Sequence, residues 1–382
     1  MHGYIPRSAE SYLARAIERS PAVAILGPRQ CGKSTLAGHF LSGRDAVHLD
    51  LQARSDLAKL DEPELFLDRH RAQLVCLDEI QRLPDFFSVL RSEIDRDRNP
   101  GRFLILGSAS RDLIRQSNES LAGRIAYLQL TPFLVSEVAN VTDLATLWMR
   151  GGFPESLLAG DDRDSADWRR DFTQSFLERD IPSLGFAVPA PVMHRLWQLL
   201  AHYHGQLVNF SKLAEAANLS VQTLKRYLAL LEQTYMLRLL PSCEANLKKR
   251  LVKAPKLYIR DTGLLHDLLD IETYDQLLGH RVKGASWEGL AMENIIAQMP
   301  RWRPSFIRTS NGAEADLVLE QGTSRRLYEF KASKAPKASR GFKELVRTLR
   351  PVAARIVAPV AASYDIGSNL RVSTLQDACM EP

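Results

Sequence analysis

The feature that most constrains this chain is a glycine-rich loop between an apolar run and a helical pattern. The residues Gly27-Pro-Arg-Gln-Cys-Gly-Lys-Ser34 match GxxxxGK[ST], directly after the apolar run Ala22–Leu26 and directly before the helical pattern Thr35–Leu41. Glycine lets backbone N–H groups turn inward around phosphates, and the N-terminal end of a helix adds partial positive charge. Strand, loop and helix in this order predict a P-loop NTPase domain, and a chance glycine-rich turn is the alternative.

We expect the loop to bind ATP together with Mg²⁺, the two predicted cofactors. The Lys33 ammonium would reach the β and γ phosphates and act in catalysis, and the Ser34 hydroxyl would be a ligand of Mg²⁺. The predicted ATP-binding residues are Gly27, Pro28, Arg29, Gln30, Cys31, Gly32, Lys33, Ser34, Thr35 and Ser108.

An acidic pair after a second apolar run supports hydrolysis. Leu74–Leu77 has the length of a buried strand and leads into Asp78 and Glu79. One carboxylate of such a pair holds the metal, and the next orients or deprotonates the attacking water. We assign Asp78 to Mg²⁺ and Glu79 to the water. Acidic pairs are common on protein surfaces, and it is the P-loop upstream that favours the catalytic interpretation.

The 382 residues predict an α/β protein of several domains. Up to residue 152, strand-length apolar runs alternate with helical patterns, which predicts a parallel sheet covered on both faces. Those runs are Ala22–Leu26, Ala46–Leu51, Leu74–Leu77, Phe103–Leu106 and Ile125–Leu130. We expect domains at residues 1–152 (P-loop ATPase), 153–190 (helical lid or linker), 191–280 (winged helix-turn-helix) and 281–382 (a smaller α/β domain).

The winged-helix prediction depends on two short helical patterns and two strands. Ser211–Ser220 and Val221–Gln233 are joined by an Asn-Leu-Ser turn, and the strand-like Met236–Leu240 and Lys256–Ile259 follow. In the last region, a helix around Trp287–Met299 precedes several short strands. This order of elements is typical of a helix-turn-helix with a wing, followed by a small domain of mixed structure.

Composition points to a cytoplasmic protein without a membrane partner. No run of 18 apolar residues is present, and the first 20 residues carry charge throughout without the apolar segment of a secretion signal. The four cysteines, Cys31, Cys76, Cys243 and Cys379, are scattered and form no CxxC pair. A reducing compartment is therefore the expected setting.

On these residues the chain resembles a family of bacterial and archaeal ATPases. That family joins an AAA+-like domain, the AAA_14 group, to a C-terminal domain of unknown function called DUF4143. The matching stretches are Tyr4–Arg7, Leu26–Thr35, Leu77–Gln81, Gly107–Ser110, Leu121–Arg124, Gly151–Pro154, Pro255–Gly263 and the segment that contains Glu329. The resemblance covers nearly the whole chain, and it implies the architecture more firmly than any pathway.

The resemblance to AAA+ proteins implies two further roles near the phosphates. In that class a polar residue after the next strand senses the γ-phosphate, which makes Ser108 the first candidate and Ser110 the second. Arg124, just before Ile125–Leu130, resembles the catalytic arginine that one subunit presents to its neighbour. Such an arginine would couple hydrolysis to assembly of an oligomer, such as a hexamer. The alternative for Arg124 is a surface arginine or an internal salt bridge.

The last region carries the residue types of a metal-dependent nuclease. Glu288 lies on the expected helix, Asp316 follows, and Glu329 and Lys331 are two residues apart on a strand, so both project from one face. Two carboxylates that hold Mg²⁺ and a lysine that orients water would hydrolyse a phosphodiester. The order resembles the PD-(D/E)xK nuclease superfamily. The alternative is a nuclease-like fold that only binds DNA.

The charge distribution favours DNA as the partner. Between Arg281 and Arg355 there are 15 Lys and Arg against 7 Asp and Glu, an excess of 8, whereas the whole chain carries a net charge of +5. Such residues contact phosphates without reading sequence, and a solvated helix face is the alternative. The predicted DNA-binding residues are Lys225, Arg226, Lys248, Lys249, Arg250, Lys334 and Lys337; Lys253 and Lys256 extend the cluster in the expected wing.

The leading functional prediction is an oligomeric ATPase that moves or remodels DNA. Branched DNA such as a Holliday junction is the expected substrate by analogy with nuclease-like resolvases. Two alternatives stay open: a nucleotide-dependent switch or scaffold that binds a protein partner, and an ATP-gated, metal-dependent nuclease.

Overall fold

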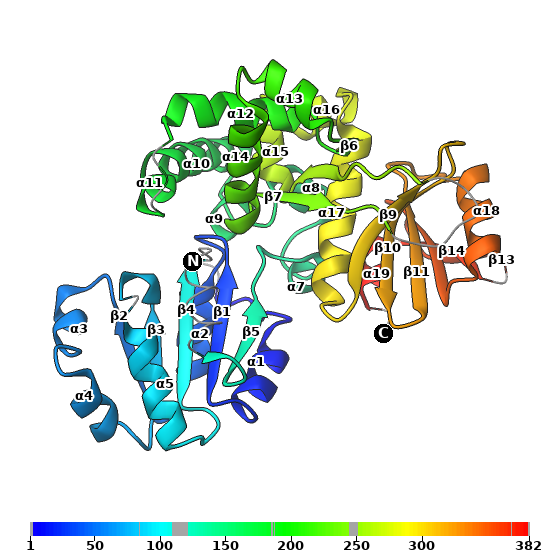
Figure 1. Ribbon diagram of the computed structural model, residues 1–382. Helices are drawn as coiled ribbons and strands as arrows, with labels where there is room; N and C mark the ends of the chain where they lie inside the picture. Colours follow the sequence, from blue (N-terminus) through cyan, green and yellow to red (C-terminus); the bar gives the residue numbers. More distant parts are fainter. Residues whose placement is uncertain are drawn as a thin grey trace. The chain divides into compact units, whose positions relative to one another are not determined.

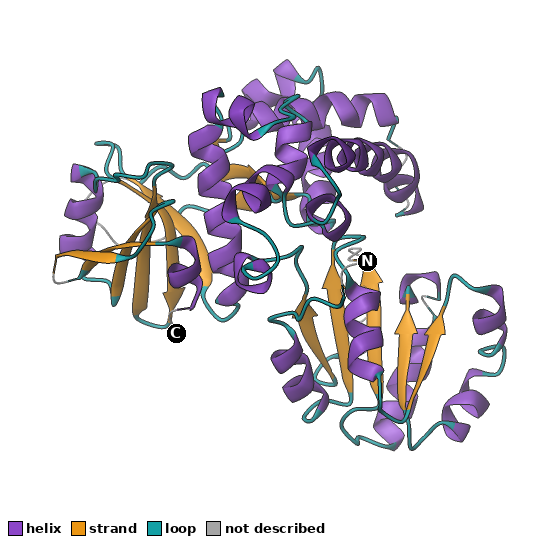
Figure 2. Cartoon of the chain, turned by 180° about the vertical axis from the view of Figure 1, so that it is seen from behind, coloured by secondary structure: helices purple, strands orange, loops and turns teal. Residues whose placement is uncertain are grey.

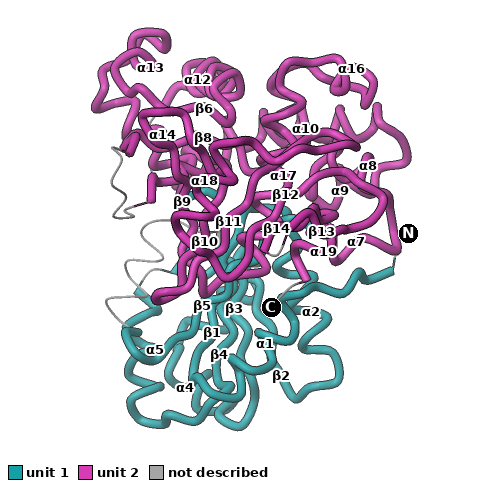
Figure 3. The backbone as a smooth tube through the Cα atoms, turned by 90° about the vertical axis from the view of Figure 1, so that its right-hand side faces the viewer, with its two compact units in different colours: residues 1–133, 233–235 teal, residues 134–232, 236–382 magenta. Residues whose placement is uncertain are grey.

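The computed structural model describes residues 3–83, 85–108, 121–184, 186, 188–243, 251–367 and 369–380, with the backbone alone at Ser108. The chain divides into two compact units, one of residues 1–133 and 233–235 and the other of residues 134–232 and 236–382 (Figure 3).

Unit 1 is built on a five-stranded parallel sheet, as the alternating pattern predicts. Its strands are β1 (Ala22–Gly27), β2 (Ala46–Asp50), β3 (Leu74–Asp78), β4 (Phe103–Ser108) and β5 (Ile125–Gln129). Their order across the sheet is β2-β3-β4-β1-β5, and every neighbouring pair is parallel. The predicted α/β fold class is confirmed. The carboxyl ends of β1, β3 and β4 meet at one edge, which is where such sheets bind ligands.

Helices cover both faces of this sheet (Figures 1 and 2). The buried side chains of β1 point alternately to one face and to the other, and each set packs against helices. Val23 and Ile25 pack with helices α1 (Glu10–Ile17) and α2 (Lys33–Leu41). Ala24 and Leu26 pack on the other side with α4 (Pro63–Arg69) and α5 (Phe86–Arg96). The remaining helical bounds on this unit are α3 (Arg54–Ala58) and the 3₁₀ turn η1 (Ile80–Arg82).

The first half of unit 2 is mostly helical. It contains α7 (Val135–Val138), α8 (Leu144–Arg150), α9 (Pro154–Leu157), α10 (Asp162–Ser175), the π-helical turn η2 (Phe176–Asp180), α11 (Ile181–Ser183) and α12 (Ala190–His202). Next come β6 (Gln206–Leu207), α13 (Phe210–Ala216), α14 (Val221–Gln233), β7 (Leu237–Leu240), β8 (Lys256–Ile259), α15 (Thr262–Asp267) and α16 (Tyr274–Gly279). The strands form a three-stranded sheet of order β6-β8-β7. Two helices followed by two antiparallel strands are the elements that the winged-helix prediction requires.

The last part of unit 2 is a six-stranded mixed sheet with helices beside it. The elements are α17 (Lys283–Gln298), β9 (Arg303–Arg308), β10 (Glu314–Gln321), β11 (Ser324–Phe330), α18 (Arg340–Leu349), β12 (Ala353–Val357), β13 (Tyr364–Gly367), β14 (Leu370–Ser373) and α19 (Leu375–Met380). The sheet order is β13-β14-β12-β11-β10-β9. Phe342 and Leu345 of α18 pack with Leu327 on one face, whereas the next residue along β11, Tyr328, donates to Met299 Sδ just after α17.

The chain between β7 and β8, where the wing was predicted, pairs with edge strand β9. Ser242 bridges to Phe306, and Leu251 bridges to Thr309. The backbone N–H of Cys243 also donates to Phe306 O at 2.7 Å. The described ends of this connection therefore extend the C-terminal sheet. Within the described residues, no helix combines the length and apolarity that a bilayer crossing needs.

Candidate functional site

The P-loop lies where β1 ends and α2 begins. Glycine is required at its two glycine positions for different physical reasons. A Cβ at Gly27 would lie 2.2 Å from Leu130 O, because the end of β5 approaches the loop closely. Gly32 has a φ of 95°, a left-handed conformation that side-chain-bearing residues rarely adopt. Glycine at both positions lets the loop turn tightly into α2. The predicted loop thus has the backbone shape that phosphate binding requires.

Lys33 begins α2 and turns back over the loop. Its Nζ donates to Pro28 O at 2.8 Å and to Gly27 O at 3.3 Å, and the residue is buried. The ammonium is therefore held inside the loop that would surround the phosphates. The donors fit an anionic group, because these carbonyl contacts can be exchanged for stronger bonds to phosphate oxygens.

Ser34 and Asp78 meet at the carboxyl edge of the sheet, as predicted for a metal-binding pair. Ser34 Oγ donates to Asp78 Oδ2 at 2.6 Å, and the backbone N–H of Glu79 donates to Asp78 Oδ1 at 2.9 Å. A hydroxyl and a carboxylate in contact are oxygen ligands of the kind that Mg²⁺ prefers. These residues fit Mg²⁺ bound with nucleotide phosphates.

Glu79 follows β3 in a left-handed conformation, with a φ of 58°. This conformation is costly for a side-chain-bearing residue and is concentrated at functional sites. The Glu79 carboxylate accepts a hydrogen bond from the side-chain amide of Gln81. Gln81 therefore orients the predicted catalytic carboxylate, a partner that the sequence analysis placed in the matching segment without giving it a role.

Arg7 is a further residue beside the loop whose role the sequence analysis missed. Its guanidinium is buried and donates to Cys31 O at 3.0 Å and to Thr131 O at 2.6 Å. It also lies over the Phe133 ring, 4.7 Å from the centroid. Arg7 thus ties the P-loop backbone to the chain after β5. The only sequence signal was its place in the matching stretch Tyr4–Arg7.

The other predicted nucleotide-site residues lie at different places around the loop. Cys31 is buried in the apolar core, where burial raises the pKa of its thiol, so it contributes backbone rather than side chain to the site. Ser34 and Thr35 are exposed at the start of α2, as is Gln30 in the loop. Ser108 pairs through its backbone with Gly27, which puts it at the same edge of the sheet. The side chain of Ser108 and all of Ser110 lie outside the described residues.

Arg124 lies at the start of β5, at the opposite end of the sheet from the P-loop. Its Nε donates to Asp95 Oδ1 at 2.8 Å and its Nη2 donates to Asp95 Oδ2 at 2.9 Å. This is the internal salt bridge that was the alternative interpretation. A role opposite a neighbouring subunit stays a prediction, and it would require Arg124 to leave Asp95.

The four predicted nuclease-like residues have different ion-pair partners. Asp316 on β10 and Glu288 on α17 both lie against Lys256 of β8, at 3.6 Å and 3.1 Å from its Nζ. Glu329, by contrast, pairs with Lys331 at 3.0 Å and accepts from the backbone N–H of Ser339 at 3.0 Å. The structure therefore brings Glu288 together with Asp316 at Lys256, and Glu329 together with Lys331. Asp316 also lies beside the strand that carries Glu329, because Leu317 pairs with Tyr328 and the backbone N–H of Phe330 donates to Asp316 Oδ2 at 2.9 Å.

Lys256 corrects one expectation about the wing. It was counted among the cations that contact phosphate, but it is buried and surrounded by carboxylates. Glu314 and Tyr258 complete this group, and neither was singled out from the sequence. Glu314 Oε1 lies 2.7 Å from Lys256 Nζ, and the Tyr258 hydroxyl donates to Glu288.

The segment Pro255–Gly263, which contains β8 of the three-stranded sheet, makes side-chain and backbone contacts with several other elements. After Lys256 and Tyr258, Arg260 pairs with Glu293 of α17 at 2.9 Å. Asp261 then accepts from the backbone N–H of Gly152 at 2.8 Å. A Cβ at Gly263 would lie 2.1 Å from Arg150 O. These contacts explain the residue types of a segment whose role the sequence did not reveal.

Helix α18 and the loop before it present a basic face, which we call the α18 face. Its side chains are all exposed, and the structure records no ion pair for any of them with the rest of the described chain. They are Lys334, Lys337, Arg340, Lys343, Arg347 and Arg350. Unpaired exposed cations keep their full charge for an external anion.

The other predicted DNA-binding residues are less clearly placed. Lys225 and Arg226 are exposed on α14, where they lie over the rings of Phe210 and Tyr227. Lys253 is exposed, whereas Lys248, Lys249 and Arg250 lie outside the described residues.

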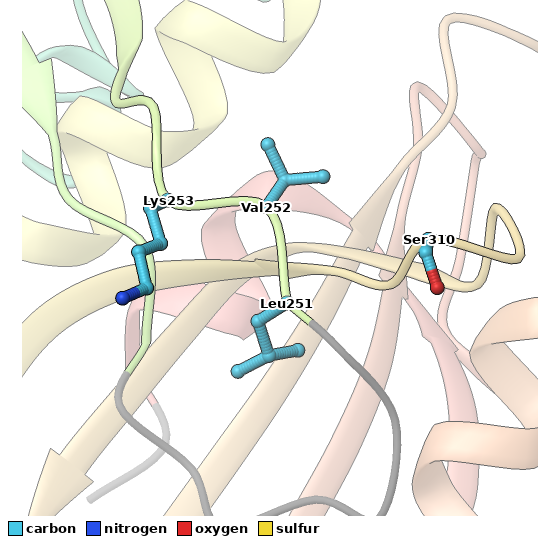
Figure 4. Close-up of a pocket in the computed structure, with 4 residues that line it drawn as sticks. All are labelled: Leu251, Val252, Lys253 and Ser310. Atoms are coloured by element: carbon cyan, nitrogen blue, oxygen red, sulfur yellow. The ribbon is translucent and has the colours of Figure 1, made fainter.

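A cavity of about 400 Å³ opens beside Lys253, lined by Leu251, Val252, Lys253 and Ser310 (Figure 4). Among the described lining residues, one ammonium and one hydroxyl are too few polar groups to define a ligand class. We therefore assign no ligand to this cavity.

Three family models match successive parts of this sequence. The AAA domain (AAA_14) matches residues 19–139, a domain of unknown function (DUF8612) matches residues 141–275, and a second one (DUF4143) matches residues 283–377. The protein is 41% identical over 355 residues to "Uncharacterized protein Rv2008c" of Mycobacterium tuberculosis and equally to "Uncharacterized protein Mb2031c" of Mycobacterium bovis. Each alignment covers 92% of this chain and 80% of the relative.

Among solved structures, the Walker-type ATPase paby2304 of Pyrococcus abyssi is similar with a TM-score of 0.49 and 16% identity, over 70% of this chain and 96% of that one. The RuvB Holliday junction branch migration motor of Thermotoga maritima is similar with a TM-score of 0.28 and 18% identity, over 62% of this chain and 90% of that one.

Proposed function

Because this chain belongs to the family that joins an AAA domain to a DUF4143 domain, we propose that it hydrolyses ATP and uses that hydrolysis on DNA bound by unit 2. The proposal of ATP hydrolysis depends on the contact of Ser34 with Asp78 beside the loop that holds Lys33. The proposal of DNA binding depends on the exposed, unpaired cations of the α18 face.

The residues of unit 1 divide the work of hydrolysis between them. Lys33 binds the β and γ phosphates when it exchanges its loop carbonyls for phosphate oxygens. Ser34 and Asp78 hold Mg²⁺, which supplies charge neutralisation at the phosphates. Glu79, oriented by Gln81, accepts a hydrogen bond from the attacking water and directs it to the γ-phosphate. Arg7 keeps the loop in the shape that these contacts need.

DNA is the partner that the charges of unit 2 favour. Lysine and arginine side chains that project from one helix and its preceding loop suit a linear array of phosphates, and they carry no information about sequence. Binding would therefore depend strongly on salt and weakly on base composition. Preference for branched DNA, assembly into a ring and a switch that binds a protein partner stay predictions, because no described contact distinguishes them.

The DNA half of the proposal is tested by a charge reversal on α18 with a matched control. The test variant is Lys343→Glu with Arg347→Glu, and the control is Arg69→Glu with Arg163→Glu, which reverses two exposed arginines on α4 and α10. Fluorescence anisotropy of labelled duplex DNA is measured at rising salt. We expect the test variant to bind at least about tenfold more weakly and with a smaller salt slope, and the control to bind like wild type. Equal affinities for all three proteins would refute the assignment of the α18 face.

A further inference from the structure

The carboxylates of the nuclease-like site face a lysine of the protein itself. Lys256 Nζ lies 2.7 Å from Glu314 Oε1, 3.1 Å from Glu288 Oε1 and 3.6 Å from Asp316 Oδ1. An ammonium has three N–H donors, and three carboxylates surround it here. The Phe306 ring, 5.5 Å from Nζ, covers the lysine further. A metal-dependent nuclease needs these same oxygens for its metal.

The rest of the group is also occupied by protein donors. Tyr258 donates its hydroxyl to Glu288, and the backbone N–H of Phe330 donates to Asp316 Oδ2 at 2.9 Å. Glu329, the remaining predicted ligand, is held by Lys331 and Ser339. In the described part of the chain, no three His, Cys, Asp or Glu side chains are arranged to hold a metal ion. The residues present therefore do not fit the metal that a nuclease would require.

The charges of the group are consistent with a lysine that stays protonated. Burial acts to lower the pKa of Lys256, but the carboxylates of Glu288, Asp316 and Glu314 outweigh it and raise this pKa above its ordinary value. Burial and the neighbouring Glu288 raise the pKa of Asp316. Removing the lysine would leave the partly buried carboxylates around it without their cation, which is unfavourable unless another cation replaces it.

We propose that Lys256 is the permanent cation of this site, so that the C-terminal domain binds no divalent metal there and does not cleave phosphodiesters. The lysine comes from β8 of the three-stranded sheet, whereas the carboxylates come from α17 and from β10 of the six-stranded sheet. The ion pairs of Lys256 therefore connect the three-stranded sheet with the C-terminal domain. This inference concerns unit 2 without nucleotide, so it stands or falls independently of ATP hydrolysis.

The test compares divalent-metal binding with and without the lysine. Mn²⁺ is titrated into nucleotide-free protein and followed by electron paramagnetic resonance, using wild type, Lys256→Met, and Lys253→Met as a control at the nearby exposed lysine. We expect Lys256→Met to bind Mn²⁺ at least about tenfold more tightly than wild type, because a positive charge near 3 Å no longer opposes the metal. The gain should disappear in Lys256→Met combined with Asp316→Asn. A folded Lys256→Met protein without this gain would overturn the proposal.

A second measurement keeps the proposal testable even if Lys256→Met does not fold. Wild type and Asp316→Asn are incubated with linear and four-way DNA in Mg²⁺ or Mn²⁺. We expect no cleavage that depends on Asp316. Cleavage by wild type that Asp316→Asn abolishes, or Mn²⁺ binding by wild type that the same variant abolishes, would show that the site takes a metal despite Lys256.

Discussion

At the scale of single residues, Lys33 and Glu79 can be separated by mutation. Lys33→Ala removes the donor that would bind the phosphates, so we expect loss of ATP binding and of turnover. Glu79→Gln removes only the carboxylate that faces the water, so ATP should still bind while turnover falls at least about 10²-fold. Calorimetric ATP binding and phosphate release measure the two effects. If Glu79→Gln turned over ATP at the wild-type rate, Glu79 would not be the water-orienting residue.

Arg7 gives a second residue-scale prediction. Arg7→Ala leaves two backbone carbonyls, of Cys31 and Thr131, without their donor, and we expect a loss of about 2–4 kcal/mol in the free energy of unfolding. We also expect a several-fold higher KM for ATP, because the loop loses its support. Arg7→Lys keeps the charge but not the paired donors, so its free energy of unfolding and its KM for ATP should lie between those of wild type and Arg7→Ala. An Arg7→Ala protein with wild-type stability and KM would contradict the role in holding the loop.

Much of the nucleotide site could be predicted from sequence because its residues are neighbours in short motifs. Gly32, Lys33 and Ser34 are consecutive, and Asp78 follows a strand whose burial the apolar run indicates. Arg7, by contrast, reaches Thr131 across 124 positions, and no local pattern reveals such a contact. The same reason explains the wrong prediction for Lys256. Its neighbours in sequence suggested a cation of the wing, whereas its ion-pair partners Glu288 and Asp316 are distant in sequence.

At the scale of elements, close approach between backbone segments decides which glycines are required. Gly151 follows α8 with a φ of 76°, and a Cβ there would lie 2.2 Å from Asp261 Oδ1. Gly151→Ala should therefore lower the free energy of unfolding by about 2 kcal/mol or more. Gly284 lies inside α17, where a Cβ would meet nothing within 4 Å. Gly284→Ala should stabilise by up to about 1 kcal/mol. Urea denaturation compares the two, and equal effects would argue against this packing.

The elements themselves were largely predictable, and the misses have two causes. All five strands of unit 1 and the helix around Trp287–Met299 lie where apolar periodicity indicated. Strands β13 and β14 were missed, since each has only four residues, and such short runs are ambiguous from periodicity alone. The pairing of the β7–β8 connection with β9 was missed because it joins distant parts of the chain.

At the scale of the whole molecule, two buried histidines make stability depend on pH. Burial lowers the pKa of His204 to about 4 and of His266 to about 3. Each ring has a nitrogen that must accept a hydrogen bond: His204 Nδ1 accepts from the Ile259 N–H at 3.0 Å, and His266 Nε2 from the Ser286 hydroxyl at 2.8 Å. Protonation would break these bonds, so both histidines are neutral in the folded protein near neutral pH.

The sign of the effect follows from these lowered values. The unfolded chain takes up protons near pH 6.5, before the folded protein does, so the contribution is complete above pH 6.5 and is lost as the pH falls towards 3–4. Each histidine adds up to about 1.4 kcal/mol per pH unit to the slope. The slope between pH 6.5 and 4 should therefore be shallower in His266→Gln than in wild type, measured by urea denaturation. Parallel slopes would mean that His266 is not buried in its neutral form.

If unit 1 hydrolyses ATP to act on DNA bound by unit 2, DNA should change the rate of ATP hydrolysis, and phosphate release measured with and without DNA tests this most directly. Linear, forked and four-way DNA are added at low salt to wild type, Glu79→Gln and the Lys343→Glu, Arg347→Glu variant. We predict that DNA raises the wild-type rate several-fold, that the α18 variant keeps its basal rate but loses the stimulation, and that Glu79→Gln shows neither. A wild-type rate that no DNA changes would contradict the claim and favour a switch that binds a protein partner.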